Sequence, residues 1–227
     1  MSYSGIKSDA LFLMQLNRFN DSKAFYEENK EKIKSGMTVP MRQIAAALSE
    51  DMLEIDEFMN TIPTKMVSRV RRDTRYTHDK RLYRENMWIM FMRPKKEWRG
   101  YPCMWFEVTP NGWSCGVGTY DAAPDYMEKF RERMRAEPKR FMSAVDSALS
   151  AGAFLDAQHY KRPKPDCPAG LEEYYNAKYL FFVFSSPDLA TLEGEEIIEI
   201  LREKYQKFAP LYSFLRDASD DYFKSRQ

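Results

Sequence analysis

Seven cationic side chains are gathered in one short stretch of this chain, between residues 68 and 85 (SRVRRDTRYTHDKRLYRE). They are Arg69, Arg71, Arg72, Arg75, Lys80, Arg81 and Arg84. Only Asp73, Asp79 and Glu85 oppose them, so this stretch carries +4, while the whole chain carries +1. A guanidinium group presents a planar fork of donors that matches the oxygens of a carboxylate or a phosphate. The stretch therefore predicts that something anionic lies among these side chains.

Two interpretations of this cluster remain open. In the first, it binds a small anionic ligand, with Asp73 orienting the guanidinium groups and with Tyr76 and Tyr83 as walls. The candidate ligand-binding residues are then Arg69, Arg72, Asp73, Arg75, Lys80 and Tyr83. In the second, Asp73 and Asp79 neutralise the cations and shape the segment, because structural ion pairs also gather charges. In both, we expect at least two of the four candidate cations to share one carboxylate or one anion, with Asp73 as the internal candidate.

An enzyme acting on a phosphorylated or carboxylated small molecule is the alternative function. Arginine and lysine would stabilise developing negative charge, and Asp73, Asp79 or His78 would transfer the proton. The sequence assigns no catalytic residue beyond this, because it contains none of the motifs G-x-S-x-G, H-E-x-x-H, G-x-x-x-x-G-K-[ST] or G-x-G-x-x-G. Nucleic acid is disfavoured as a partner, because the near-neutral chain lacks a broad basic footprint. Two further basic segments, residues 93–99 and 161–164, are expected to be ordinary solvated loops. The alternative is that they converge with the cluster and form a pocket for phosphate or carboxylate.

Neither a metal nor a cofactor is expected. The two histidines, His78 and His159, are not at metal-ligand spacing from any of the three cysteines. No apolar run approaches the roughly 20 residues that span a bilayer, and residues 1–20 have no signal-peptide pattern. We therefore expect a cytoplasmic protein without a membrane partner. The sequence gives no indication of the oligomeric state.

The elements that position the cluster follow from periodicity. Helical spacing covers residues 8–19, 22–33 and 40–52, with Gly36 predicted to end the second helix. Strands are predicted at residues 67–71, 87–92, 103–108, 113–119 and 179–184. Helices return at 124–134, 138–149 and from about 195, where Pro210 is expected to restart the last one. This order predicts one α+β domain over residues 1–227, with a central antiparallel sheet of about four to six strands flanked by N-terminal and C-terminal helices.

The predicted hairpin at residues 103–119 has two different faces. Alternation places Met104, Phe106, Val108, Trp113, Cys115 and Val117 on an apolar face. The other face holds Cys103, Trp105, Glu107, Ser114, Gly116 and Gly118, so Cys103 and Cys115 are not expected to form a disulfide. Because glycine allows close approach, we expect a helix to pack on this second face. The alternative is a flat ligand or a proline-rich segment lying beside Trp105.

Residues 69–83 also resemble a known family. The pattern R-x-x-R-D-x-R-F-x-x-x-K-x-P-Y is matched by Arg69, Arg72, Asp73, Arg75, Tyr76, Lys80, Leu82 and Tyr83. Tyr76 replaces the phenylalanine of the pattern, and Leu82 replaces its proline. This pattern is similar to that of the family called domain of unknown function 2461. The resemblance extends nearly end to end and implies a soluble, mostly bacterial protein of about this length, with no assigned activity and no catalytic residues to carry over.

Overall fold

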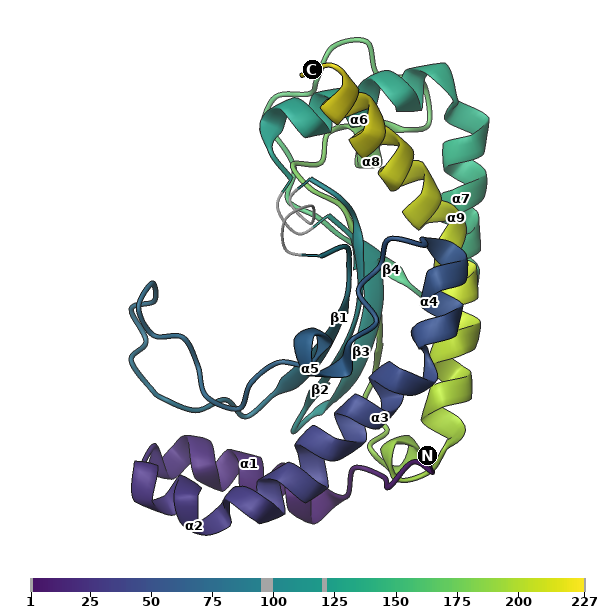
Figure 1. The fold of residues 1–227 in the computed structure, drawn as a ribbon. Helices are drawn as coiled ribbons and strands as arrows, with labels where there is room; N and C mark the ends of the chain where they lie inside the picture. The colour runs from purple at the N-terminus through teal and green to yellow at the C-terminus, as the bar shows by residue number, and fades with distance from the viewer. Residues whose placement is uncertain (1, 95–99, 120–121, 227) are drawn as a thin grey trace.

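The computed structural model describes residues 2–94, 100–119 and 122–226 (Figure 1). In this part of the chain, one antiparallel sheet has the strand order β1-β2-β3-β5-β4. Its strands are β1 Met87–Phe91, β2 Cys103–Thr109, β3 Gly112–Gly118, β4 Phe154–Asp156 and β5 Phe181–Ser186. The predicted α+β class and the antiparallel sheet are confirmed.

Helices precede and follow the sheet, as predicted. The N-terminal ones are α1 Ser8–Asn20, α2 Lys23–Ile33, the π-helical turn η1 Lys34–Thr38, α3 Val39–Ala47, α4 Ser49–Ile55 and α5 Pro63–Met66. The later ones are α6 Pro124–Ala136, α7 Pro138–Ser150, α8 Glu172–Tyr175, the 3₁₀ turn η2 Ala190–Glu193 and α9 Glu196–Lys224. The side chain of Ser22 accepts a hydrogen bond from the amide of Phe25 and so caps α2, as its position in the sequence indicated.

Two predicted helix boundaries are wrong. Gly36 does not end a helix: α2, η1 and α3 follow one another without a break, and a β-carbon at Gly36 would lie 2.7 Å from that of Ala10 in α1. Gly36 therefore allows α1 and the continuous α2–η1–α3 helix to pack closely. The π turn precedes Pro40, whose ring would clash with a regular helical carbonyl, and the amide of Val39 bonds to the carbonyl of Lys34 instead. Pro210 likewise lies inside the continuous helix α9.

One face of the sheet is covered by long helices. Figure 1 shows α3, α4, α7 and α9 on the same side of the sheet. The covered face carries the predicted apolar set from Met104 to Val117, all of it buried. Tyr205 of α9 packs edge-on against Phe91 at 5.4 Å, and its hydroxyl donates to the carbonyl of Trp105 at 2.9 Å. The buried face of α9 therefore continues across Pro210, which explains why the helix does not restart there.

The other face of the sheet corrects a prediction. Within the described residues, no long helix packs on the side of Trp105, Gly116 and Gly118. A β-carbon at Gly116 would lie 2.1 Å from the ring of Trp105, and one at Gly118 would lie 2.4 Å from the ring of Phe181. Aromatic rings of neighbouring strands thus occupy the space above the glycines. Cys115 lies on the covered face and Cys103 on the opposite one, so these two form no disulfide with each other, as predicted.

A buried ion pair joins α4, the end of β1 and α9. Arg93 donates to both carboxylate oxygens of Asp56, at 2.8 and 3.3 Å, and the hydroxyl of Tyr212 donates to the same carboxylate at 2.7 Å. The side chains of Asp56 and Arg93 are 1% and 10% exposed. Burial raises the pKa of Asp56, but the hydrogen bonds from Arg93 and Tyr212 outweigh it and bring the pKa below its usual range.

We predict that Asp56→Asn destabilises the protein by about 3–5 kcal/mol, because it leaves the charge of Arg93 buried without its counter-charge. Asp51→Asn is the matched control, because Asp51 also lies on α4 and pairs with Arg202 of α9 at 2.9 Å, but with more exposed side chains. We expect that control to cost less than about 1 kcal/mol. Urea unfolding followed by circular dichroism measures both, and equal losses of stability would contradict the prediction.

Candidate functional site

The arginine-rich stretch forms an arm that leaves the sheet next to α5. We call residues 68–86 the arginine arm; Figure 1 shows it extending from the sheet alongside α1 and α2. The predicted strand at residues 67–71 is wrong in extent, since only isolated bridges form, Val67 with Ile89 and Arg71 with Tyr83. The two sides of the arm are joined by backbone hydrogen bonds from Arg72 to Leu82 at 2.8 Å and from Arg84 to Val70 at 2.9 Å. Side-chain contacts must therefore supply much of its shape.

One carboxylate in the arm binds three arginines. Asp79 lies 2.7 Å from Arg18 of α1, 2.7 Å from Arg72 and 3.1 Å from Arg81. Hydrogen bonds from Arg81 and then Arg18 hold the pKa of Asp79 well below its usual range. The expectation that Asp73 would be the shared counter-charge is therefore wrong. Asp79 has this role because α1 contributes a third guanidinium group that local sequence spacing does not reveal.

The candidate residues divide into separate groups. Asp73 bonds to Arg75 alone, at 2.6 and 2.9 Å, and these bonds lower the pKa of Asp73 to about 2. Lys80 donates to the carbonyl of Thr74 at 2.9 Å. At least two of the four candidate cations were expected to contact the same carboxylate or the same anion. Within the described residues, no carboxylate pairs with two of these four cations, which are Arg69, Arg72, Arg75 and Lys80.

The last candidate, Tyr83, is an anchor of the arm rather than an accessible wall. It is buried and stacks on Tyr26 of α2, with ring centroids 4.8 Å apart. Asp21, between α1 and α2, accepts hydrogen bonds from the amides of Leu82 and Tyr83 at 2.6 and 3.3 Å. Arg18 donates to the carbonyl of Tyr83 at 2.9 Å. The base of the arm is thus bound to the first two helices.

Arg84 is a cation for which the described residues provide no ion-pair partner. Its guanidinium carbon lies 4.3 Å from the ring centroid of Trp88, which is a cation–π distance. Its Nε atom is buried and has no hydrogen-bond partner within the described part of the chain. Burial lowers the pKa of Arg84, and the nearby charges of Arg72 and Arg18 lower it further, while the charge of Glu107 opposes them in part. A partly buried cation beside like charges is energetically suited to accept an anion.

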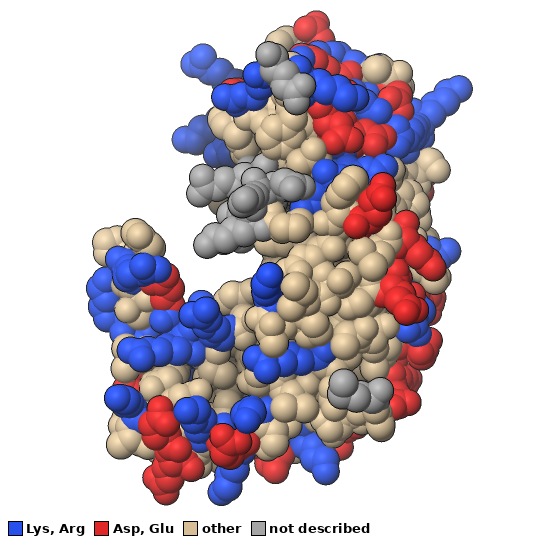
Figure 2. Space-filling view, in the orientation of Figure 1, with Lys and Arg blue, Asp and Glu red and all other residues tan. Residues whose placement is uncertain are grey.

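A hollow lies between the arginine arm and the rest of the protein. Figure 2 shows this hollow, with lysine and arginine side chains gathered on the arm at one side of it. Next to β1 it forms a groove of about 750 Å³, lined by Lys65, Ser68 and Arg69 as well as by Trp88, Met90 and Met92. Of the residues predicted to bind a ligand, Arg69 alone is part of this lining.

The groove continues over the face of the sheet that no long helix covers. The continuation, about 390 Å³, shares Trp88, Met90 and Met92 with the first part. It is also lined by Cys103, Trp105, Glu107, Asp156, Phe181 and Val183. We call these two parts together the sheet groove. One of its ends therefore has basic residues and its middle is aromatic. Asp156 lies at its far end, whereas Glu107 lies across from Trp88. Sequence alternation had placed Trp105 and Glu107 on this face, but it did not indicate that Arg84 and Trp88 belong to the same site.

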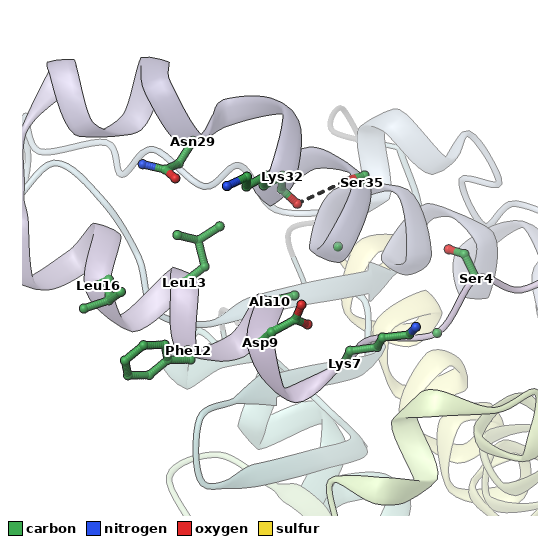
Figure 3. A pocket seen from close by; sticks show the side chains of 12 residues that line it. Ser4, Lys7, Asp9, Ala10, Phe12, Leu13, Leu16, Asn29, Lys32 and Ser35 are labelled. Atoms are coloured by element: carbon green, nitrogen blue, oxygen red, sulfur yellow. Dashed lines mark hydrogen bonds between the residues drawn. The ribbon is translucent and has the colours of Figure 1, made fainter.

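Another hollow, of about 570 Å³, lies between α1 and the α2–η1 helix (Figure 3). Phe12, Leu13 and Leu16 of α1 line it, and Asn29 and Lys32 lie on the opposite helix (Figure 3). The amide of Asn29 already donates to the carbonyl of Phe25 at 2.9 Å. Its charged lining residues are Lys7, Asp9 and Lys32, which mix both signs, so it offers a weaker site for an anion than the sheet groove.

Of the two further basic segments, the described residues Arg93 and Pro94 line the first part of the groove, whereas residues 161–164 line neither part. Arg93 was expected in a solvated loop, but it is buried in the ion pair with Asp56, because Tyr101 and Phe58 pack on its guanidinium group. Lys95, Lys96, Trp98 and Arg99 lie outside the described residues. Lys161 and Arg162 are exposed, as expected, and Lys164 lies 3.8 Å from Glu128 and over the ring of Tyr160.

We predict that Asp79→Asn loosens the arm and that Asp73→Asn does not. The first change removes the charge shared by three arginines, whereas the second affects Arg75 alone. Amide hydrogen exchange at Arg72 and Arg84, whose amides join the two sides of the arm, should be several-fold faster in Asp79→Asn. The same amides in Asp73→Asn should exchange as in the wild type. Faster exchange in Asp73→Asn than in Asp79→Asn would contradict the prediction and would make Asp73 the central counter-charge.

A pH dependence of the arm follows from the same carboxylate. The folded pKa of Asp79 lies below the unfolded value of about 3.9, so its contribution is fully present above that value and is lost as the pH falls below it. We therefore expect the arm amides to keep constant protection from neutral pH down to about pH 5 and to lose protection in stronger acid. Asp79→Asn should flatten this profile. An unchanged profile in that variant would contradict the assignment.

Comparison with known proteins identifies the family. Among the described residues, no helix has both the length and the apolar character needed to cross a membrane. A search of curated proteins gave no match. A family model described as "conserved hypothetical protein (DUF2461)" matches residues 9–214, which include every helix from α2 to α8, all five strands and the arginine arm. The resemblance expected from residues 69–83 is therefore confirmed, and the chain belongs to the DUF2461 family.

Proposed function

We propose that this protein is a binding domain for a small anionic ligand, which it takes in the sheet groove. The anion-binding side chains are Arg69 and Arg84, with Lys65 at the rim. Of the residues considered from the sequence, Arg72, Asp73, Arg75, Lys80 and Tyr83 shape and anchor the arm, and Arg69 binds the ligand.

The observation that carries this proposal is the contrast between two classes of cation in one arm. Arg72, Arg75 and Arg81 each have a carboxylate within 3.1 Å. By contrast, neither Arg69 nor Arg84 has a carboxylate within ion-pair distance in the described part of the chain, although Glu107 acts on Arg84 from farther away. Arg69 lines the groove together with Trp88, and Arg84 lies over the ring of Trp88. Cations that a fold holds beside a groove without counter-charges are suited to a ligand that brings the charge.

An enzymatic role has less support. Two of the proton-transfer groups considered, Asp73 and Asp79, have pKa values lowered by their arginine partners, whereas a general base works best with a pKa near the working pH. The third, His78, is exposed on the arm and does not line the groove.

We also place the protein in the bacterial cytoplasm. Cys115 and Cys167 are free thiols, and Cys103 lies on the face of the sheet opposite to Cys115. Free thiols are usual in reducing compartments. Burial raises the pKa of Cys115 to about 12, which keeps its thiol protonated and unreactive.

The test compares tripolyphosphate and chloride at matched ionic strength. At ten times its dissociation constant, a bound anion should stabilise the wild type by about 1.4 kcal/mol. For a chain of this size that corresponds to a rise in Tm of about 3–6 °C. Arg69→Gln and Arg84→Gln should each remove most of this rise.

Arg75→Gln is the matched control, because it makes the same charge change on the same arm at a cation that is already paired with Asp73. It should keep the full rise in Tm. A rise that survives in Arg69→Gln, Arg84→Gln double variants, or one that Arg75→Gln removes equally, would place the anion elsewhere.

A further inference from the structure

We infer that the ligand of the sheet groove is a nucleotide, with its base on the aromatic middle of the groove and its phosphates at Arg69 and Arg84. This inference rests on the proposed anion site and identifies the chemical class of the whole ligand. It follows from three features: half-buried rings on the face of the sheet opposite the long helices, basic residues at one end of the groove with Asp156 at the other, and the low net charge of the chain.

The rings lie where a planar group can stack. Trp88 and Trp105 are half-buried on the uncovered face, on the neighbouring strands β1 and β2. Trp88 lies across from Glu107, two residues from Trp105, so the two tryptophans are diagonal neighbours. Phe181 meets Trp105 edge-on, with ring centroids 5.3 Å apart and planes at 87°. Base–aromatic stacking on such exposed rings is a common source of affinity for nucleotides.

The glycine of β3 helps to hold this surface in place. The ring of Trp105 fills the space above Gly116, where any side chain would collide with it. Trp105 therefore packs against the sheet backbone on one side and lines the groove with the rest of its surface. A ring fixed in this way loses little conformational freedom when a second ring stacks on it.

Charges at the two ends match the two ends of a nucleotide. Lys65 and Arg69 line the basic end, and Arg84 lies beside it over the ring of Trp88, so phosphate oxygens there would accept hydrogen bonds from these cations. Asp156 of β4 lies at the far end, whereas Glu107 lies across from Trp88, beside the base of the arm. Glu107 accepts a hydrogen bond from Asn86 at 2.5 Å, which fixes its position. Carboxylates are the natural acceptors for the exocyclic amino groups of a base.

The charge of the chain favours a single nucleotide over a long strand. A protein that binds a polyanion usually carries a broad basic surface. Here the net charge is +1, and Asp156 lies at the far end of the groove. The first part of the groove, about 750 Å³, is within the usual range of small-molecule sites.

The experiment is isothermal titration calorimetry of the full chain without added metal, with ATP and inorganic tripolyphosphate at matched ionic strength. ATP should bind at least about tenfold more tightly, because only ATP brings a base to stack. Trp88→Leu and Trp105→Leu should each reduce that preference to less than about threefold, with tripolyphosphate affinity unchanged. Phe154→Leu is the control, since Phe154 is an exposed ring on the same sheet that lines neither part of the groove.

The outcomes separate this inference from the proposed function. Equal affinities for ATP and tripolyphosphate, both lost in Arg84→Gln, would keep the anion site and overturn the nucleotide. Absence of binding by either compound at millimolar concentration would overturn both. A ten-residue single-stranded oligonucleotide that binds more than a hundredfold more tightly than ATP would assign the groove to nucleic acid instead. The wild-type comparison of ATP with tripolyphosphate decides the matter even where a tryptophan variant fails to fold.

Discussion

The position of the arginine arm depends on one carboxylate. Asp79 lies within ion-pair distance of Arg72 and Arg81 in the arm and of Arg18 in α1, 61 residues earlier in the chain. A single negative charge cannot neutralise three cations, so the arm keeps a positive field while it gains a fixed shape. Asp21 holds the returning side of the arm through two backbone amides. These two carboxylates keep Arg84 over Trp88 and Arg69 at the wall of the groove.

The uncovered face of the sheet is the second condition for a site. A sheet in an α+β protein can leave one face to solvent, but that face is then usually polar. Here Trp88, Met90 and Trp105 stand on it, and two glycines of β3 lie under the rings of neighbouring strands instead of under a helix. Half-buried aromatic surface that a protein keeps beside unpaired cations is typical of a binding groove.

The sequence predicted those features that depend on local periodicity. Alternation in residues 103–119 assigned each side chain to the correct face, because a strand has a period of two whatever packs on it. It failed where distant segments decide. Arg18 of α1 pairs with Asp79, which makes Asp79 rather than Asp73 the shared counter-charge. Gly36 lies against Ala10 of α1, so it is needed for helix packing and does not end a helix. The helix α9 continues through Pro210 because its buried face extends on both sides of this residue. The sequence predicted the site only in part. It showed Arg84 as one of several basic residues, but the contact between Arg84 and Trp88 depends on how the arm folds back to the sheet.

The arm therefore separates two tasks that one stretch of sequence encodes together. Its outer part uses cations with internal partners, Arg75 with Asp73 and Lys80 with the carbonyl of Thr74, and this part determines shape. Its base places cations without such partners against an aromatic surface. Charge density alone cannot distinguish the two, since both parts are rich in basic side chains. What distinguishes them is whether a counter-charge is already present, and this makes the base of the arm the part that is suited to a ligand.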